Sequence, residues 1–238
     1  MSVIANGITA GVLAPAAYNA ITVSAGYSDK VLLQGLIVEG TGVGYNGISY
    51  NSGAELTVSH CVIRGFVDVN GIESGNGITV VSQSDAKLAV FDTKISGNTQ
   101  NGVHFYMYPN SGATSSLVTT RLVADGNRNS IYLDLASALP SLTATIADTT
   151  LSHNTGGGVI VSGNNAYAIV DGSRIARNNI GLSTLNAAKA FLRNSAVFGN
   201  SASGVSVGTG TIHYSYRNNG INGNGTDVSG TVTTAPQL

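Results

Sequence analysis

The chain contains an internal repeat, and this feature restricts the possible folds more than any other. Successive copies end 26, 32, 29, 27, 24 and 22 residues apart. Self-similarity at such a period is the signature of a solenoid, in which each repeat stacks on the one before it. The aligned copies are VLLQGLIVEG (31–40), ELTVSHCVIRGF (55–66), KLAVFDTKISGN (87–98), SLVTTRLVADGN (116–127), TATIADTTLSHN (143–154), YAIVDGSRIARN (167–178) and KAFLRNSAVFGN (189–200).

A second short run follows each copy, usually with a glycine just ahead of its first apolar residue. No segment has helical periodicity, so each unit consists of two or three short strands. Short strands separated by turns at a variable period predict a parallel β-helix, and the leucine framework of leucine-rich repeats is missing. We therefore predict an all-β, single-stranded parallel β-helix of about eight to nine coils, forming one domain over residues 1–238. The runs are NGISYN (46–51), NGITVV (76–81), NGVHFY (101–106), NSIYLD (129–134), GGVIVS (157–162), NIGLST (179–184) and SGVSVG (203–208).

Stacked coils place equivalent residues in rows, because neighbouring strands lie about 4.8 Å apart. Two apolar rows form the predicted core. One contains Ile48, Ile78, Val103, Ile131, Val159, Leu182 and Val205, and the other contains Leu32, Val58, Val90, Ile146, Val170 and Leu192, with Thr119 as the exception. A third row lies at a turn, where stacked amides can bond along the axis, and we interpret it as structural. It contains Asn98, Asn127, Asn154, Asn178 and Asn200.

The repeats resemble those of a known group of proteins. The copies FDTKISGNTQNGVHF and FLRNSAVFGNSASGVSV are similar to repeats of bacterial right-handed parallel β-helix proteins, the pectin lyase-like superfamily. The resemblance covers about residues 20–225, and its motif is specific for the fold alone. The superfamily includes pectate lyases, polygalacturonases, other polysaccharide lyases, phage tailspikes and adhesin-like surface proteins. The resemblance implies a right-handed coil and a polysaccharide-related role outside the cell or at its surface.

Charge and hydropathy exclude several classes of partner. Only 10% of the residues are charged and the formal net charge is −1. This balance gives no electrostatic case for nucleic acid or for an anionic membrane, and we expect neither as a partner. No stretch reaches the roughly 18 apolar residues of a membrane helix, and the first residues lack the basic leader of a signal peptide. No cofactor is expected.

A cluster of large side chains stands out on an otherwise small-residue face. Alternation along the second run places His104, Tyr106, Tyr132 and Asp134 on the outside of two adjacent coils, with Tyr108 close behind. Stacking predicts His104 beside Tyr132 and Tyr106 beside Asp134 at about 5 Å. Aromatic faces next to polar groups suit sugar rings. The cluster therefore predicts a surface that binds polysaccharide.

A polysaccharide lyase is the alternative function. His104 or Tyr132 would act as the base, and Arg128 would neutralise a uronate carboxylate. A glycoside hydrolase would instead need two carboxylates about 5 to 9.5 Å apart, and Asp134 stands alone on this face. A calcium-dependent pectate lyase would need acidic ligands with a Lys or Arg base, and no such cluster appears.

A purely structural or adhesin-like module without activity is the third interpretation. It predicts that loops 106–116 and 134–141 fold over the aromatic side chains and bury them. The loop 65–77 offers Asp68, Asn70 and Glu73 as oxygen ligands, yet it lacks the further carboxylates of a calcium loop. No metal site is expected there.

The two ends of the solenoid differ. The first coil, 1–29, is apolar and has no capping helix that we can identify. Exposed strand edges at such an end favour self-association. Residues 210–238 predict a last coil followed by a Thr-rich tail that folds over it.

Overall fold

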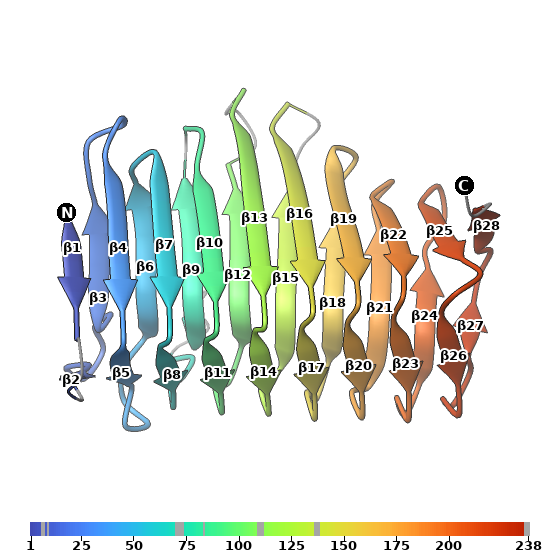
Figure 1. Ribbon diagram of the computed structural model, residues 1–238, viewed down its shortest axis with the longest axis horizontal. Helices are drawn as coiled ribbons and strands as arrows, with labels where there is room; N and C mark the ends of the chain where they lie inside the picture. Colours follow the sequence, from blue (N-terminus) through green and yellow to red (C-terminus); the bar gives the residue numbers. More distant parts are fainter. Residues whose placement is uncertain are drawn as a thin grey trace.

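The chain winds into a β-solenoid with three flat sides (Figure 1). The structure is a computed structural model that describes residues 1–5, 8, 10–69, 74–82, 84–108, 112–135 and 139–235. Each coil gives one strand to each of three sheets, which hold 10, 9 and 9 strands. All strand pairings are parallel between successive coils, as the repeat predicts, and among the described strands the register shifts only in the pairing of β3 with β6, at Val23 and Ser24. The described residues contain no helix, and hence none long and apolar enough to cross a bilayer.

The strands are short, and the turns between them set the three sides. Sheet A holds β1 (Ser2–Ile4), β4 (Lys30–Gln34), β7 (Glu55–Ser59), β10 (Lys87–Phe91), β13 (Thr114–Thr120), β16 (Ser141–Ala147), β19 (Ala166–Asp171), β22 (Lys189–Arg193), β25 (Ile212–Tyr216) and β28 (Thr233–Ala235). Sheet B holds β2 (Ala10–Leu13), β5 (Leu36–Glu39), β8 (Val62–Arg64), β11 (Lys94–Ser96), β14 (Val123–Asp125), β17 (Thr150–Ser152), β20 (Arg174–Ala176), β23 (Ala196–Phe198) and β26 (Gly220–Asn222). Sheet C holds β3 (Ile21–Ser24), β6 (Asn46–Ser52), β9 (Asn76–Ser82), β12 (Asn101–Met107), β15 (Asn129–Leu135), β18 (Gly157–Ser162), β21 (Ile180–Leu185), β24 (Ser203–Val207) and β27 (Val228–Ser229).

The predicted apolar rows form the core, with one correction. The row from Ile48 to Val205 is in register along sheet C and fully buried. In sheet A the residue paired with Val58 is Leu33, not the predicted Leu32. Leu33 is 2% exposed, whereas Leu32 lies on the outer face, half-buried. A slip of one residue moves a side chain to the opposite face, because the strand period is two.

The predicted asparagine row is confirmed as a ladder of side-chain hydrogen bonds. In each coil the amide nitrogen donates to the Oδ1 atom of the next asparagine, for example from Asn154 to Asn178 at 2.7 Å and from Asn178 to Asn200 at 3.0 Å. The backbone N–H of Asn154 donates to the same Asn178 oxygen at 3.0 Å. The ladder closes the turn between sheets B and C and continues one coil further, to Asn224. These asparagines therefore satisfy buried backbone groups, as a structural role requires.

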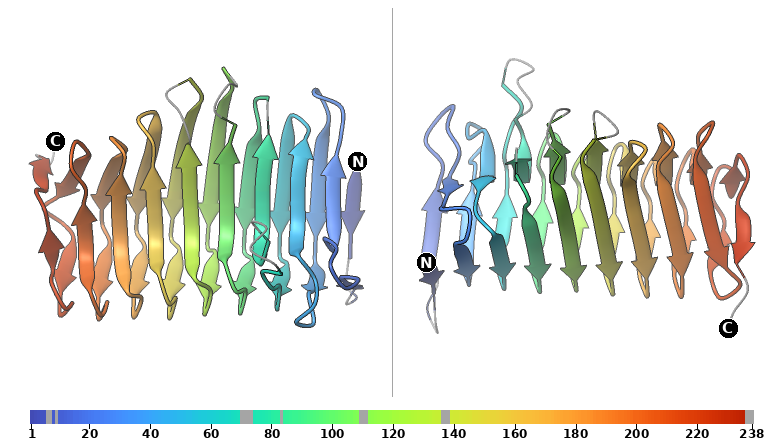
Figure 2. Two further views of the ribbon diagram at one scale, coloured as in Figure 1. Left: turned by 180° about the vertical axis from the view of Figure 1, so that it is seen from behind. Right: turned by 90° about the horizontal axis from the view of Figure 1, so that it is seen from above.

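The ends of the solenoid expose strand edges (Figure 2). Edge strands β1 and β2 carry exposed apolar side chains, among them Ile4 at 50% and Leu13 at 64% exposure. The predicted self-association of this coil stays a prediction. At the other end β27 pairs with β24 and β28 pairs with β25, so the tail as far as Ala235 adds further parallel strands.

Candidate functional site

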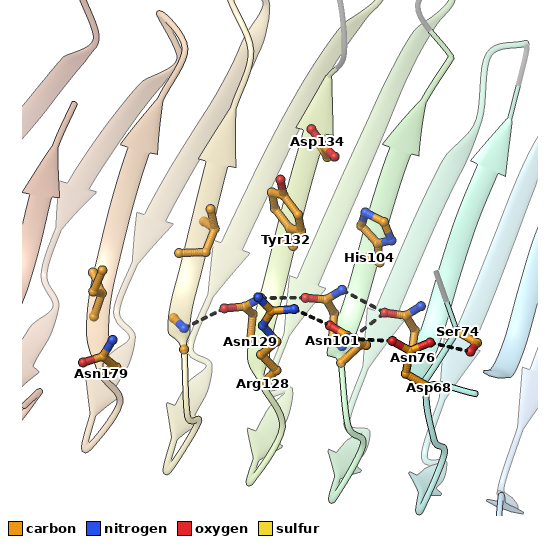
Figure 3. A pocket seen from close by; sticks show the side chains of 15 residues that line it. Asp68, Ser74, Asn76, Asn101, His104, Arg128, Asn129, Tyr132, Asp134 and Asn179 are labelled. Carbon is orange, nitrogen blue, oxygen red and sulfur yellow. Dashed lines mark hydrogen bonds between the residues drawn. The ribbon is translucent and has the colours of Figure 1, made fainter. Parts of the chain in front are cut away.

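A groove of about 670 Å³ lies on the outer face of sheet C. Residues of successive coils line it, from the segment around Asp68 and Asn76 to Asn179 and Ile180 (Figure 3). It therefore crosses several strands and runs along the solenoid rather than along one strand. Four of the residues that we predicted for the site line this groove, namely His104, Arg128, Tyr132 and Asp134.

Two glycines line the groove where neighbouring coils lie close together. Gly156 and Gly157 stand one coil beyond Arg128 and Asn129. A Cβ atom added to Gly156 would lie 2.5 Å from the Asn129 Oδ1 atom. The two glycines therefore let the coils approach closely at this part of the groove.

His104 and Tyr132 form the aromatic part of the groove. They are paired in register in β12 and β15, as predicted, and their rings stack with centroids 5.3 Å apart and planes 14° from parallel. His104 is only 6% exposed, and its Nε2 atom is buried without a hydrogen-bond partner among the described residues. This burial lowers the pKa of His104 to about 4, since desolvation disfavours the charged ring. His104 is therefore neutral at physiological pH.

A chain of polar contacts holds Arg128 at the foot of the groove. The Arg128 Nη1 atom donates to Gln100 Oε1 at 2.9 Å, and Gln100 Nε2 donates to Asp68 Oδ2 at 3.0 Å. The Ser74 hydroxyl donates to the other Asp68 oxygen at 3.0 Å. Arg128 is exposed, so its guanidinium stays accessible from the groove. These hydrogen bonds fix one edge of the Arg128 guanidinium, and the rest of the charged group can still contact a ligand.

A second asparagine ladder runs beside the contacts of Arg128, Gln100 and Asp68. Asn76 donates to Asn46 at 3.0 Å, Asn101 to Asn76 at 2.8 Å and Asn129 to Asn101 at 2.8 Å. It ends where the backbone N–H of Gly157 donates to Asn129 at 2.7 Å. The ladder forms a polar wall along the groove.

The predicted aromatic patch is divided by the structure. Tyr106 pairs in register with Asp134, as expected, but neither Tyr106 nor Tyr108 lines the groove. The Tyr106 ring lies 6.2 Å from that of His104 and meets the Tyr108 ring edge-on at 5.5 Å. Tyr108 is 37% exposed. The five side chains thus form one contiguous cluster, of which His104, Tyr132 and Asp134 face the groove.

The third interpretation predicted that loops bury the cluster, and the structure shows only part of the cluster buried. His104 is buried, whereas Tyr106, Tyr132 and Asp134 are only half-buried. Parts of both loops, residues 109–111 and 136–138, lie outside the described residues, as do Asn70 and Glu73 of the candidate calcium loop. Over the described ranges, no three His, Cys, Asp or Glu side chains are placed to share a metal ion.

Sequence reasoning missed several residues of the groove. The second asparagine ladder was visible as a repeated Asn at the start of four sheet C strands, in NGISYN, NGITVV, NGVHFY and NSIYLD, whereas Gln100 carried no such signal. Gly156 and Gly157 carry a signal too, because they belong to a run of three glycines, GGG at 156–158. Asp68 was considered only as an oxygen ligand of the 65–77 loop, and its place beside the groove was not predicted, because it depends on the path of the long loop before β9.

The geometry agrees with the comparison against known families. The model of the right-handed β-helix region matches residues 106–235, more than half of the 238 residues. The chain belongs to the right-handed β-helix family. The crystal structure of the Dettilon tailspike protein is similar to this β-helix, with 13% sequence identity and a TM-score of 0.49. The alignment covers 98% of this β-helix but 60% of the tailspike chain, so the tailspike is considerably longer. A search of curated proteins found no match.

Proposed function

We propose that this β-helix is an extracellular or cell-surface protein that binds polysaccharide in the groove of sheet C. The observation that carries the proposal is the stacked His104–Tyr132 pair, set among polar side chains in an elongated hollow. A sugar ring presents C–H faces and a rim of hydroxyls. Aromatic rings bind the faces, and fixed polar groups bind the rim.

The shape of the groove favours a chain over a small molecule. Its lining residues come from successive coils, which repeat at about 4.8 Å, so each coil offers a similar row of contacts to an extended polymer. Arg128 and Asp134 lie at different heights on the same strand, β15, or just before it (Figure 3). They give the groove a donor at its foot and an acceptor above the rings.

Affinity electrophoresis tests the proposal directly. The protein would run through gels containing polygalacturonate or alginate, which are rich in uronates, or dextran, which is neutral. Loss of the Tyr132 ring or the Arg128 cation should weaken binding about tenfold, as expected for one stacking or one charged hydrogen-bond contact. Tyr132→Ala and Arg128→Ala are therefore the test variants.

Matched controls lie on another side of the solenoid. Tyr214→Ala removes a half-buried tyrosine from the outer face of sheet A, and Arg193→Ala removes an arginine paired with Asp171. Both controls should be retarded like the wild type. Equal weakening in control and test variants, or no retardation of the wild type by any polymer, would overturn the groove as the binding site and favour the structural module.

A lyase is the second candidate, because a neutral imidazole and a fixed cation line the same groove. Arg128 would bind the uronate carboxylate, and the neutral His104 ring or Tyr132 would take the proton from the adjacent carbon. The electron pair would form a carbon–carbon double bond as the glycosidic C–O bond breaks, and the leaving oxygen would take up a proton. Ultraviolet absorbance of unsaturated products during the same binding assays separates lyase from binder.

A further inference from the structure

A second histidine is buried at the C-terminal end of the solenoid, far along the axis from the groove (Figure 1). His213 of β25 is 1% exposed, and neither of its ring nitrogens has a hydrogen-bond partner within the described ranges. Buried polar groups without partners are rare in native proteins and ask for an explanation. The binding groove does not use this residue.

His213 occupies a core row that is otherwise apolar. It pairs in register with Ala190 of β22. Tyr214 pairs with Thr233 of β28. The preceding residue, Val232, therefore lies beside His213 in the next coil along the axis. The remaining members of the row, all buried, are Val31, Leu56, Leu88, Leu117, Ala144 and Ala168.

We propose that His213 makes the end of the solenoid acid-labile, so that protonation of its ring releases the last coil, β25 to β28, from the core. A protonated imidazole carries two N–H donors and a positive charge, and the described residues around both buried ring nitrogens offer no acceptor. Within the described residues the cover over it is thin, because β28 has three residues and two of them are exposed. Opening this coil therefore costs much less than unfolding the chain, as is general for the ends of repeat proteins.

Among the described residues, no charge near the ring compensates for protonation. Strand β28, which pairs with β25, carries no titratable side chain, and neither do β24, β26 and β27 of the last coils. Asp227 is the nearest acid in the sequence, but it is exposed and accepts hydrogen bonds from Asn224. The titratable side chains of β22, β25 and the turn after it lie on the outer face or in solvent, namely Lys189, Arg193, Tyr214, Tyr216 and Arg217.

Burial lowers the pKa of His213 to about 4, from 6.5 in an exposed ring. The opened coil takes up a proton near pH 6.5 and the closed coil only near pH 4. The stability of the closed coil relative to the open coil is therefore complete above pH 6.5 and decreases as the pH falls toward 4. Between pH 7 and pH 5 the opening equilibrium should rise roughly 20-fold.

Hydrogen exchange of the full chain, measured by mass spectrometry at pH 7 and pH 5, tests this inference. After correction for intrinsic exchange chemistry, peptides covering 212–235 should lose about 20-fold protection at pH 5. Peptides from β19 and β20, which the opening of the last coil does not expose, should remain more protected than 212–235 at both pH values and serve as an internal control. The variants His213→Leu and His213→Phe continue the apolar row and cannot titrate. In these variants the protection of the same peptides should change by less than about twofold between pH 7 and pH 5.

Two results would overturn the proposal. One is a loss of protection at pH 5 in a folded His213 variant that equals the loss in the wild type. The other is protection of peptides 212–235 that does not change with pH in the wild type. Should both variants fail to fold, a nuclear magnetic resonance titration of the wild-type ring decides. A His213 ring that titrates near pH 6.5 in the folded protein contradicts the inference, and one that titrates near pH 4, together with the loss of protection, supports it.

Discussion

His104 and His213 show how position in the repeat decides what a buried residue does. His104 points outward from β12 and is covered by the stacked Tyr132 ring, at the edge of the groove. His213 points inward from β25 and is covered by the coil that ends the solenoid. Desolvation lowers the pKa of both rings to about 4. In our proposals, His104 belongs to the binding groove and His213 controls the integrity of the last coil.

Removal of the Tyr132 ring should expose His104. In Tyr132→Ala we expect the pKa of His104 to rise from about 4 toward 6.5, because water regains access to the imidazole. A titration followed by nuclear magnetic resonance measures the shift. Tyr108→Ala is the matched control, since Tyr108 contacts Tyr106 and does not line the groove. A His104 pKa that is unchanged in Tyr132→Ala would show that other groups keep the ring dry.

Removal of one amide from the first asparagine ladder should cost more than one hydrogen bond. Asn154 accepts from the backbone N–H of Asn127 at 2.9 Å and donates to Asn178 at 2.7 Å. Asn154→Ala leaves buried groups unpaired on both sides, and we expect the free energy of unfolding to fall by about 3 kcal/mol. Urea denaturation measures the change. The exposed Asn222 provides the control, and equal losses in Asn222→Ala and Asn154→Ala would contradict a ladder role.

At the scale of the element, three consecutive strands of sheet C, β6, β9 and β12, begin with an Asn-Gly pair that serves the stacking of coils rather than a hairpin. The asparagine belongs to the second ladder, and the glycine lets the next coil approach. A Cβ atom at Gly102 would lie 2.6 Å from the Ser130 carbonyl oxygen, which is backbone and cannot move aside alone. The dipeptide thus fixes the distance between coils.

Two glycine substitutions separate crowding from backbone strain. Gly102→Ala forces neighbouring coils apart and should destabilise by about 3 kcal/mol. Gly97 has a φ of +65° but nothing within 4 Å of an added Cβ, so Gly97→Ala should cost only about 1 kcal/mol. Midpoints of urea unfolding give the comparison. The reverse order would mean that the turn, not the contact between coils, limits stability.

The sequence predicts the elements well because the repeat enforces its own register. Once Val103 and Ile131 are aligned, the pairing of His104 with Tyr132 follows without further information. Leu32 was misplaced by one residue because its copy, VLLQG, contains consecutive apolar residues that fit either face. The groove was harder to predict, because its lining comes from several coils and depends on how their side chains pack. The contact of Asp68 with Gln100 depends on a long loop, whose path no repeat sets.

At the scale of the whole molecule, the two buried histidines make stability depend on pH. Each contributes stability that is complete above pH 6.5 and decreases as the pH falls toward 4, since the unfolded chain binds the proton more tightly. The lowered pKa values of Asp92, Asp125 and Asp227 act in a different window, below their ordinary value of 3.8. Between pH 7 and pH 5 the histidines therefore dominate these contributions.

We expect the free energy of unfolding to fall by about 2 kcal/mol per buried histidine between pH 7 and pH 5. Urea titrations at a series of pH values measure the fall in the midpoint. His213→Leu should remove about half of it, because His104 remains. A wild-type midpoint that is constant over this range would contradict the burial of neutral rings.

The apolar edge at the first coil leads to a separate expectation. Exposed Ile4 and Leu13 lie on strands with one unpaired edge, so the protein should associate at high concentration. Analytical ultracentrifugation of wild type and Ile4→Lys measures this, and the lysine should shift the equilibrium toward monomer. The control, Leu185→Lys, places the charge on an exposed side chain in the middle of the solenoid. Equal effects of both lysines would exclude the edge as the contact.

The two asparagine ladders donate in opposite directions along the axis. From Asn98 to Asn224 each amide N–H points toward the C-terminal end, whereas from Asn129 back to Asn19 each points toward the N-terminal end. An α-helix adds its peptide dipoles head to tail and so accumulates an axial field. Here the two rows of amide dipoles oppose each other. Because the first row runs toward the C-terminal end and the second toward the N-terminal end, the whole solenoid accumulates little net axial dipole from its amide rows.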